Sequence, residues 1–229
     1  MRFFILTLFP QIILDATNFS ILKRAKEKNL IEIIAIDIRK FAKDKHRITD
    51  LPPYGGGAGM VLKPEPIFLA VQNIFDTYNI TKEETEILLL SAGGKLFNQE
   101  KAKELSNNEN IILIAGHYEG IDERVAENLA TQEISIGNYV LSGGEYPALI
   151  IIDTIARLIP NVLENEESLK TESFHSNRSV EYPQYTRPEN YNGLEVPKIL
   201  LSGNHKKIEE WRKEESRKKT NKNRKDLLT

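Results

Sequence analysis

The segment from Ile134 to Leu158, ISIGNYVLSGGEYPALIIIDTIARL, constrains the fold more than any other part of the chain. A short β-like run breaks into a glycine-bearing loop, and this loop enters an almost uniformly apolar stretch. Pro147 suits the first turn of a helix, where a missing N–H costs nothing, and Pro160 ends the helix. The pattern predicts a helix from about Pro147 to Ile159. Because Ala148 to Ile152 are apolar on every face, we expect this helix to be buried in a core or an interface.

The rest of the N-terminal part alternates between strand-like and helical patterns. Helical patterns occupy about Glu65 to Tyr78 and Asn98 to Leu105. Continuous apolar strands separated by helices are typical of a parallel sheet covered on both faces. The sequence therefore predicts an α/β domain over residues 1–160, with a parallel sheet flanked by helices. Its expected strands are Arg2 to Leu8, Ile31 to Ile38, Glu86 to Ser91, Asn110 to Gly116 and Thr131 to Gly137.

Composition excludes several classes of protein. The chain has 229 residues, 40% of them hydrophobic and 28% charged, which is ordinary for a globular protein. It contains no cysteine, so disulfides and thiolate metal sites are excluded. We find neither a signal peptide nor an apolar run of membrane-spanning length, and we expect a cytoplasmic protein with no membrane contact. The four histidines form no close ligand cluster, so we predict no metal site built by the protein.

The C-terminal quarter has a different character. Residues 161–181 are polar and lack a sustained apolar period, so we predict a flexible linker. Residues 182–229 form a small, mainly helical domain, with a charged helix from His205 to Lys219 anchored by Ile208 and Trp211. From Ser216 to Thr229 the chain carries six basic residues and one acidic residue. Such a segment indicates either a nucleic-acid contact or a frayed, solvated tail.

Glycine-bearing loops follow three of the expected strands, at Ser91 to Gly94, Gly116 to Gly120 and Gly137 to Tyr139. In open parallel sheets, ligands bind beyond the carboxyl ends of the strands, where glycine lets them approach the backbone. Tight strand-to-helix turns are the alternative explanation for any one of these loops. Three successive loops of this kind favour a shared ligand pocket.

Charged side chains near these loops allow two interpretations each. Asp122 and Glu123 suit capping of the following helix, whereas Glu119 is the better candidate for orienting a substrate base. Arg157 stands four residues after Asp153, a spacing that stabilises helices, but an arginine on an apolar helix also suits a substrate that develops negative charge. The cluster YGGGAGM at Tyr54 to Met60 is neither a P-loop nor a dinucleotide-binding fingerprint. This glycine cluster could be a flexible hinge or a loop that adapts to a ligand, and the sequence does not separate the two.

Several long motifs occur in the same order as in one known family. They are YGGGAGM at 54–60, GHYEGIDERV at 116–125, SIGNYVLSGGE at 135–145, YPQYTRP at 182–188, VPKILLSGNH at 196–205 and WR at 211–212. Together they resemble the bacterial tRNA (guanine-N1)-methyltransferases of the SPOUT class over nearly the whole chain. The resemblance implies methyl transfer from S-adenosylmethionine to N1 of the guanosine immediately 3′ of the anticodon, position 37 of the tRNA. It also implies a homodimer, a trefoil knot in the N-terminal domain, a tRNA-binding C-terminal domain over residues 182–229 and an active site shared between subunits.

The resemblance further assigns roles to residues. Arg157 matches the catalytic arginine of the family, which would stabilise charge that develops on O6 of the guanine. Glu172, before Ser173-Phe174, stands where the family has an aspartate as general base. A magnesium ion is reported for the family and is a second expected cofactor. The residues that match the methyl-donor site are Leu89, Leu90, Ser91, Gly116, Tyr118, Glu119, Ile136, Gly137, Tyr139, Val140, Leu141, Gly143, Gly144 and Pro147.

This chain departs from the family pattern in its linker. Glutamate replaces aspartate at Glu172, one extra residue lies between Phe174 and Tyr182, and Glu181 replaces a second acidic residue. Two other functions therefore remain open. One is a tRNA-binding protein of the same fold without catalysis. The other is a SPOUT methyltransferase that acts on a different RNA.

Overall fold

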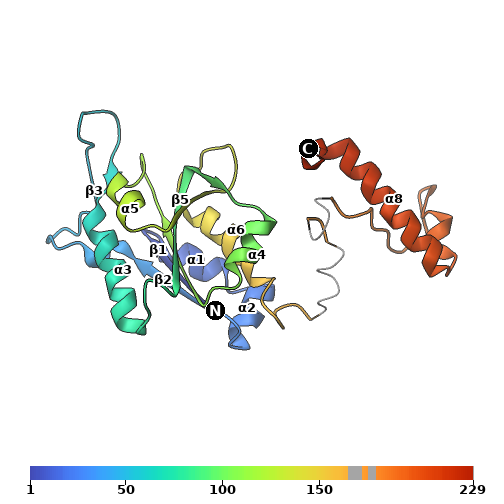
Figure 1. Cartoon of the computed structure of the whole chain (residues 1–229), viewed down its shortest axis with the longest axis horizontal. Coiled ribbons are helices and arrows are strands. Elements are labelled where there is room, and N and C mark those ends of the chain that lie inside the picture. The colour runs from blue at the N-terminus through green and yellow to red at the C-terminus, as the bar shows by residue number, and fades with distance from the viewer. Residues whose placement is uncertain (165–171, 175–178, 229) are drawn as a thin grey trace. The chain divides into compact units, whose positions relative to one another are not determined.

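The computed structural model describes residues 1–164, 172–174 and 179–228, and the chain divides into two compact units (Figure 1). The first unit is Met1–Glu164 and the second is Asn165–Thr229. Residues 165–171 and 175–178 of the predicted linker lie outside the described residues. The boundaries expected for that linker and for a separate C-terminal domain stay predictions.

A five-stranded sheet forms the centre of the first unit. Every neighbouring pair of strands in it is parallel, and the strand order is β2-β1-β6-β5-β7. The predicted parallel α/β fold is therefore confirmed, whereas the knot implied by the resemblance stays a prediction. The strands are β1 (Arg2–Thr7), β2 (Glu32–Asp37), β5 (Thr85–Leu96), β6 (Asn110–Ala115) and β7 (Gln132–Ser135).

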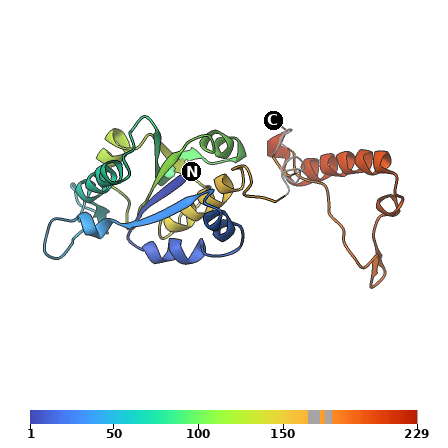
Figure 2. The same cartoon turned by 90° about the horizontal axis from the view of Figure 1, so that it is seen from below.

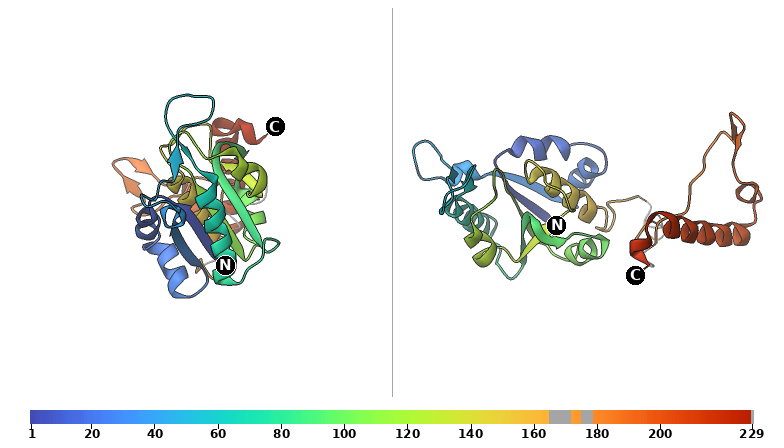
Figure 3. Two further views of the ribbon diagram at one scale, coloured as in Figure 1. Left: turned by 90° about the vertical axis from the view of Figure 1, so that its left-hand side faces the viewer. Right: turned by 90° about the horizontal axis from the view of Figure 1, so that it is seen from above.

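Alternate side chains of each strand enter two separate cores, one on each face of the sheet. In β1, Phe3 and Ile5 pack on one face, and Phe4 and Leu6 pack on the other. The first core is completed by α1 (Pro10–Ala16), α2 (Ser20–Glu27), α4 (Gln99–Leu105) and α6 (Glu145–Ala156). The second is completed by η1 (Ile38–Phe41), α3 (Pro64–Tyr78) and α5 (Glu123–Asn128). Figures 2 and 3 show these helices on both faces of the sheet.

Helix α6 begins and ends a few residues earlier than the sequence predicts. It starts at Glu145 and ends at Ala156, so Pro147 still lies in the first turn, where its missing N–H breaks no helical hydrogen bond. Ala148, Ile151 and Ile152 are fully buried, but Ile150 is 44% exposed. The core of this unit therefore buries one side of the helix, and burial of the other side in an interface stays a prediction.

The cluster of glycines at 54–60 connects two very short antiparallel strands, β3 (Asp50–Leu51) and β4 (Val61–Leu62). Each strand contributes two residues to the pairing. The loop between them is largely exposed, and Tyr54 at its start is completely so. The two-residue strand β3 therefore precedes this loop, with Pro52 and Pro53 between them.

The second unit is built around the long helix α8 (His205–Asn223), which is preceded by a hairpin of β8 (Asn190–Tyr191) and β9 (Leu194–Glu195) and by η2 (Lys198–Leu201). The helix extends four residues beyond the predicted end and is followed by η3 (Lys225–Leu227). Much of the basic segment from Ser216 is therefore helical. Across the described parts of the chain, no helix combines the length and the apolar character that crossing a membrane requires.

Part of the predicted linker is bound to α8. The backbone N–H of Val180 donates to Oγ1 of Thr220 at 3.0 Å, and Oγ of Ser216 donates to the Val180 carbonyl at 2.6 Å. Thr220 is 1% exposed. The N–H of Glu181 also donates to Oγ of Ser173 at 2.9 Å. The described residues beside Glu172 thus belong to the same folded unit as α8.

Candidate active site

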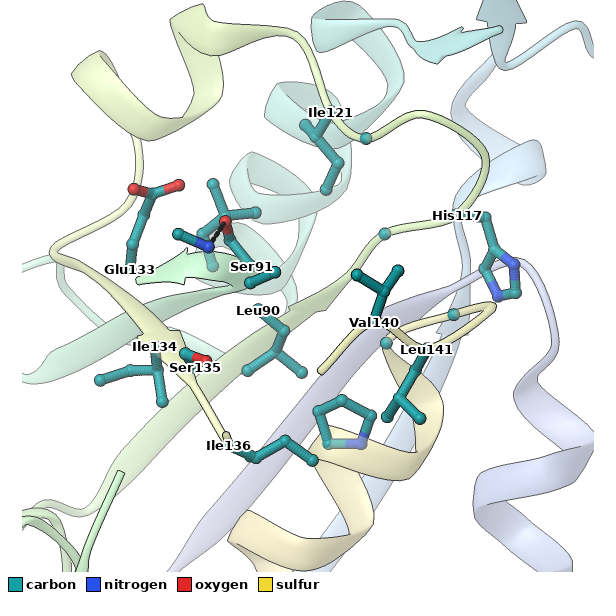
Figure 4. Close-up of a pocket in the computed structure, with 18 of the residues that line it drawn as sticks. Leu90, Ser91, His117, Ile121, Glu133, Ile134, Ser135, Ile136, Val140 and Leu141 are labelled. Carbon is teal, nitrogen blue, oxygen red and sulfur yellow. Dashed lines mark hydrogen bonds between the residues drawn. The ribbon is translucent and has the colours of Figure 1, made fainter. Parts of the chain in front are cut away.

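A pocket of about 380 Å³ lies at the carboxyl edge of the sheet. It is bounded by the middle of β5, by the segments that follow β6 and β7, and by the first turn of α6. Figure 4 shows apolar side chains from β5 (Leu90) and from the loop after β7 (Ile136 and Leu141) around the hollow. All fourteen residues predicted for the methyl-donor site line this one pocket. Their role in binding stays a prediction, but the predicted grouping of the three glycine-bearing segments is present.

The segment Ser91 to Gly94 is a bulge inside β5, and the prediction of a loop after the strand is wrong there. Leu90 and Lys95 both pair with Ile134 of β7, so the four residues between them leave the ladder and return to the same point. The bulge is held by Oγ of Ser91, which accepts a hydrogen bond from the Gly93 N–H at 3.1 Å (Figure 4). Strand pairing resumes at Lys95, and Leu96 then pairs with Ser135 of β7.

The loops after β6 and β7 are joined directly to each other. The N–H of Gly144 donates to the Gly116 carbonyl at 2.8 Å, and His117 and Gly143 form an isolated antiparallel bridge. A Cβ atom at position 144 would lie 2.6 Å from Cα of Ala115. This close backbone approach is possible only for glycine, and it fixes the start of α6 against the end of β6.

A buried polar cluster lies beside the pocket, and the sequence analysis did not identify it. Glu145 is 2% exposed and accepts a hydrogen bond from Oγ1 of Thr7. Its carboxylate also bonds to Nε2 of His117 at 2.7 and 2.9 Å. The His117 ring packs edge-on against Phe9, with the ring centroids 5.0 Å apart. Glu145 thus ties the ends of β1 and β6 to the first turn of α6.

One signal in the sequence could have revealed Glu145. It is the only charged residue between Asn138 and Ile152, at the start of a helix predicted to be buried. A buried carboxylate is costly unless hydrogen bonds compensate it, so such a residue implies partners elsewhere in the chain. Those partners, Thr7 and His117, lie too far away in the sequence for any local pattern to identify them.

We expect Glu145→Gln to weaken the pocket. Glutamine keeps the volume but removes the charge-assisted bonds to Thr7 and His117, which should cost about 1–3 kcal/mol. The free energy of unfolding, measured by urea titration, should fall. Glu133→Gln is the matched control, because Glu133 also lines the pocket but is only partly buried. Equal values for both variants would contradict this account of Glu145.

Glu119 connects the pocket to the glycine cluster. Its N–H donates to the Met60 carbonyl at 3.0 Å, and the Leu62 N–H donates to the Gly120 carbonyl at 2.9 Å. Gly59 has a φ of +81°, and a Cβ atom there would lie 2.4 Å from Cγ of Glu119. Glycine is therefore required at position 59 both by its backbone conformation and by the side chain that packs on it.

Asp122 caps α5, as the sequence predicts. Its carboxylate accepts hydrogen bonds from the backbone N–H of Arg124 at 3.1 Å and from Nε of Arg124 at 2.7 Å. The side-chain hydrogen bond from Arg124 is the main reason why the pKa of Asp122 lies below its usual value. Glu123 lies in the first turn, where a negative charge is favourable, and it also lines the pocket.

The two predicted catalytic residues do not line the pocket of the single chain. Arg157 is the partly buried C-cap residue of α6, and its N–H donates to the Asp153 carbonyl at 3.2 Å. Glu172 is partly buried within the second unit. Among the residues that the structure describes, no group of three or more acidic or histidine side chains is arranged to hold a metal ion.

The sheet and its pocket define an α/β protein with a hollow at the carboxyl ends of parallel strands, where open α/β folds bind their ligands. The chain matches the family described as tRNA (Guanine-1)-methyltransferase TrmD over residues 1–229. It therefore belongs to this family, and the resemblance is confirmed.

Three relatives show how far the similarity extends. A tRNA (guanine-N(1)-)-methyltransferase of Clostridioides difficile is 54% identical over 227 residues, covering 99% of this chain and 97% of the relative. A protein of the same name from Dictyoglomus turgidum is 51% identical over 228 residues, covering all of this chain and 90% of the relative. One from Caldicellulosiruptor saccharolyticus is 53% identical with the same coverage. The similarity thus includes both units.

Proposed function

We propose that this protein transfers a methyl group from S-adenosylmethionine to N1 of the guanosine immediately 3′ of the anticodon of tRNA. The observation that carries the proposal is the convergence of fourteen family-matched residues on one pocket, in a chain of the tRNA (guanine-1)-methyltransferase family. We further propose a cytoplasmic location, because tRNA is the substrate. A requirement for Mg²⁺ stays an expectation of the resemblance.

The pocket fits the methyl donor in size and chemistry. Its volume lies within the range of small-molecule sites, and apolar side chains alternate in its wall with exposed backbone groups. Leu90, Ile136 and Pro147 offer apolar surface to an adenine ring, and the glycine-bearing loops offer backbone donors and acceptors to its edges. When bound, S-adenosylmethionine supplies an electrophilic methyl group on a positively charged sulfonium.

The chain's own residues would handle the proton and the charge. N1 of guanine carries a proton, which must leave as the new bond to carbon forms, and the Glu172 carboxylate would accept it. Negative charge then builds towards O6, and the Arg157 guanidinium would stabilise it. Glutamate has the same chemistry as the family's aspartate with one more methylene group.

We also propose a homodimer. Tyr146 and Ile150 stand four residues apart on α6 and are 59% and 44% exposed. On neighbouring α1, Ile12 and Leu14 are 37% and 41% exposed. An apolar surface shared by two adjacent helices is typical of a subunit interface, and most homo-oligomers pair such a surface with itself. The sharing of an active site between subunits stays a prediction.

Ile150→Glu should convert the dimer to a monomer. In a twofold dimer, the glutamate of one subunit would face the same glutamate of the other. Both carboxylates would lose their water and repel each other. Sedimentation velocity at micromolar concentration should give half the wild-type mass. Phe19→Glu is the control, because Phe19 is 70% exposed and lies outside α6 and α1. A dimeric Ile150→Glu protein would refute this interface.

The activity is tested by transfer of labelled methyl from S-adenosylmethionine to two tRNA transcripts. The transcripts differ only in a guanosine or an adenosine immediately 3′ of the anticodon. We expect label only in the first, at N1 of that guanosine, as nuclease digestion and chromatography would verify. Equal labelling of the two transcripts would refute the proposed specificity.

The presence of Glu172 in place of the family's aspartate favours one alternative, a tRNA-binding protein that has lost catalysis. This alternative predicts salt-sensitive tRNA binding with no methyl transfer to any transcript. A third candidate, methylation of a different RNA, predicts label in total RNA but none at the position next to the anticodon. Methyl transfer to the two transcripts and to total RNA, together with tRNA binding, separates the three functions.

A further inference from the structure

The second unit contains a hollow with aromatic walls, separate from the pocket at the sheet. It lies between the segment 182–185 and the first two turns of α8. Tyr185 and Trp211 face it with ring centroids 6.3 Å apart and a tilt of 54°, so the two rings do not stack face to face on each other. Tyr185 is 48% exposed. Both rings therefore present aromatic surface to a further planar group.

Arg212 also lines the hollow. Its guanidinium carbon lies 4.8 Å from the centroid of the Tyr182 ring, and Nη1 lies 3.8 Å from the Glu209 carboxylate. Its Nε is buried and has no hydrogen-bond partner among the described residues. The Arg212 side chain as a whole is 37% exposed, so its guanidinium can still meet an acceptor at the mouth of the hollow.

The charge of the lining indicates the chemistry of the occupant. His205, Lys206 and Arg212 line the hollow together with a single carboxylate, Glu209. A planar group with acceptor oxygens, attached to a polyanion, matches the aromatic faces, the arginine donor and the basic rim. Unpaired bases of RNA are recognised by stacking on aromatic rings and arginine planes, with hydrogen bonds to their edges.

We propose that this hollow binds one unpaired base of the tRNA substrate. The base stacks on the exposed Tyr185 ring and meets Trp211 edge-on, and the Arg212 guanidinium donates to one of its carbonyl oxygens. The proposal rests on the proposed function, because it takes tRNA as the partner, but it concerns a site that methyl transfer itself does not need. A second copy of the chain, inserting an apolar side chain, is the competing occupant.

Trp211 is the only tryptophan of the chain, so its fluorescence reports on this hollow directly. Addition of a tRNA transcript to the full-length protein should quench the emission, with a midpoint equal to the dissociation constant from filter binding. A fully base-paired RNA duplex with the same number of phosphates should bind through its backbone without this quenching. Equal quenching by the duplex would overturn the proposal.

Variants test the stacking itself. Tyr185→Ala should weaken tRNA binding about tenfold, as loss of one aromatic platform does, while the salt dependence stays unchanged because no phosphate contact is lost. Tyr185→Phe should restore the affinity, and Arg212→Lys should lower it despite keeping the charge. Tyr191→Ala is the matched control, since Tyr191 is 63% exposed on β8 and does not line the hollow.

Three outcomes would overturn the inference: wild-type affinity in Tyr185→Ala, unquenched Trp211 in protein that binds tRNA, or quenching that follows protein concentration without RNA. The last would assign the hollow to a second copy. The proposed function is tested separately, by the methyl-transfer assay. Normal transfer with unquenched Trp211 rejects only the base-binding hollow, whereas quenching without transfer rejects only the catalytic proposal.

Discussion

Replacement of Glu172 by glutamine is expected to lower kcat for methyl transfer by about 10²- to 10⁴-fold, the usual contribution of a general base. Glutamine has nearly the same shape as glutamate but cannot take up the N1 proton of guanine. Glu172 belongs to the second unit, whereas the predicted donor residues lie in the first. The affinity for S-adenosylmethionine should therefore stay at the wild-type value, so the loss should appear in kcat alone.

Single-turnover kinetics with saturating tRNA measure this effect, and calorimetry measures the donor affinity. Glu181→Gln is the matched control, because it removes the other acidic side chain near the same end of the linker and should leave kcat within a factor of about two. Glu172→Asp, which restores the family's residue, should retain activity. Wild-type turnover in Glu172→Gln would exclude Glu172 as the base.

Gly144→Ala should damage the pocket, because the added methyl group meets the backbone at the end of β6. The new Cβ would lie 2.6 Å from Cα and 2.9 Å from Cβ of Ala115, and 2.9 Å from the Gly116 nitrogen. These atoms belong to the end of β6, so relief requires movement of the backbone itself. Overpacking of this kind costs about 1–3 kcal/mol or more, and the hydrogen bond from Gly144 to Gly116 would lengthen or break.

We expect the melting temperature to fall by several degrees and the affinity for S-adenosylmethionine to fall at least tenfold. Scanning calorimetry and isothermal titration measure the two quantities. Gly93→Ala is the control in the same pocket, because its Cβ would meet only Oγ of Ser91, at an ordinary 3.6 Å. If Gly144→Ala matched Gly93→Ala in both measurements, the close approach of α6 to β6 would not be essential.

The sheet could be predicted from the sequence because each buried strand is a continuous apolar run. β6, for example, is NIILIA, and every residue in it is buried. The start of α4 is equally predictable, because asparagine is a preferred N-cap residue. In the structure, the Asn98 side chain accepts a hydrogen bond from the Lys101 N–H. The convergence of the glycine-bearing segments followed from the rule that parallel strands place their carboxyl ends at one edge.

The features that escaped prediction depend on contacts between distant residues. The bulge in β5 is set by its pairing with β7, which no local pattern in Ser91 to Gly94 reveals. The cluster of Glu145 with Thr7 and His117 requires the ends of two strands and a helix to be placed first. The burial of Thr220 depends on Val180, forty residues earlier. In each case tertiary structure, not local propensity, determines the outcome.

The bulge in β5 has a consequence for how this pocket can diverge. Ile134 pairs with both Leu90 and Lys95, so the four residues between Leu90 and Lys95 leave the sheet and rejoin it at the same position of β7. Residues can be added or removed there without changing which side chains of β5 enter the core. The cost of such a change in length is set by loop closure, about 0.6 kcal/mol for each doubling. Insertions and deletions can thus reshape one wall of the pocket in evolution or engineering while the fold beneath it stays intact.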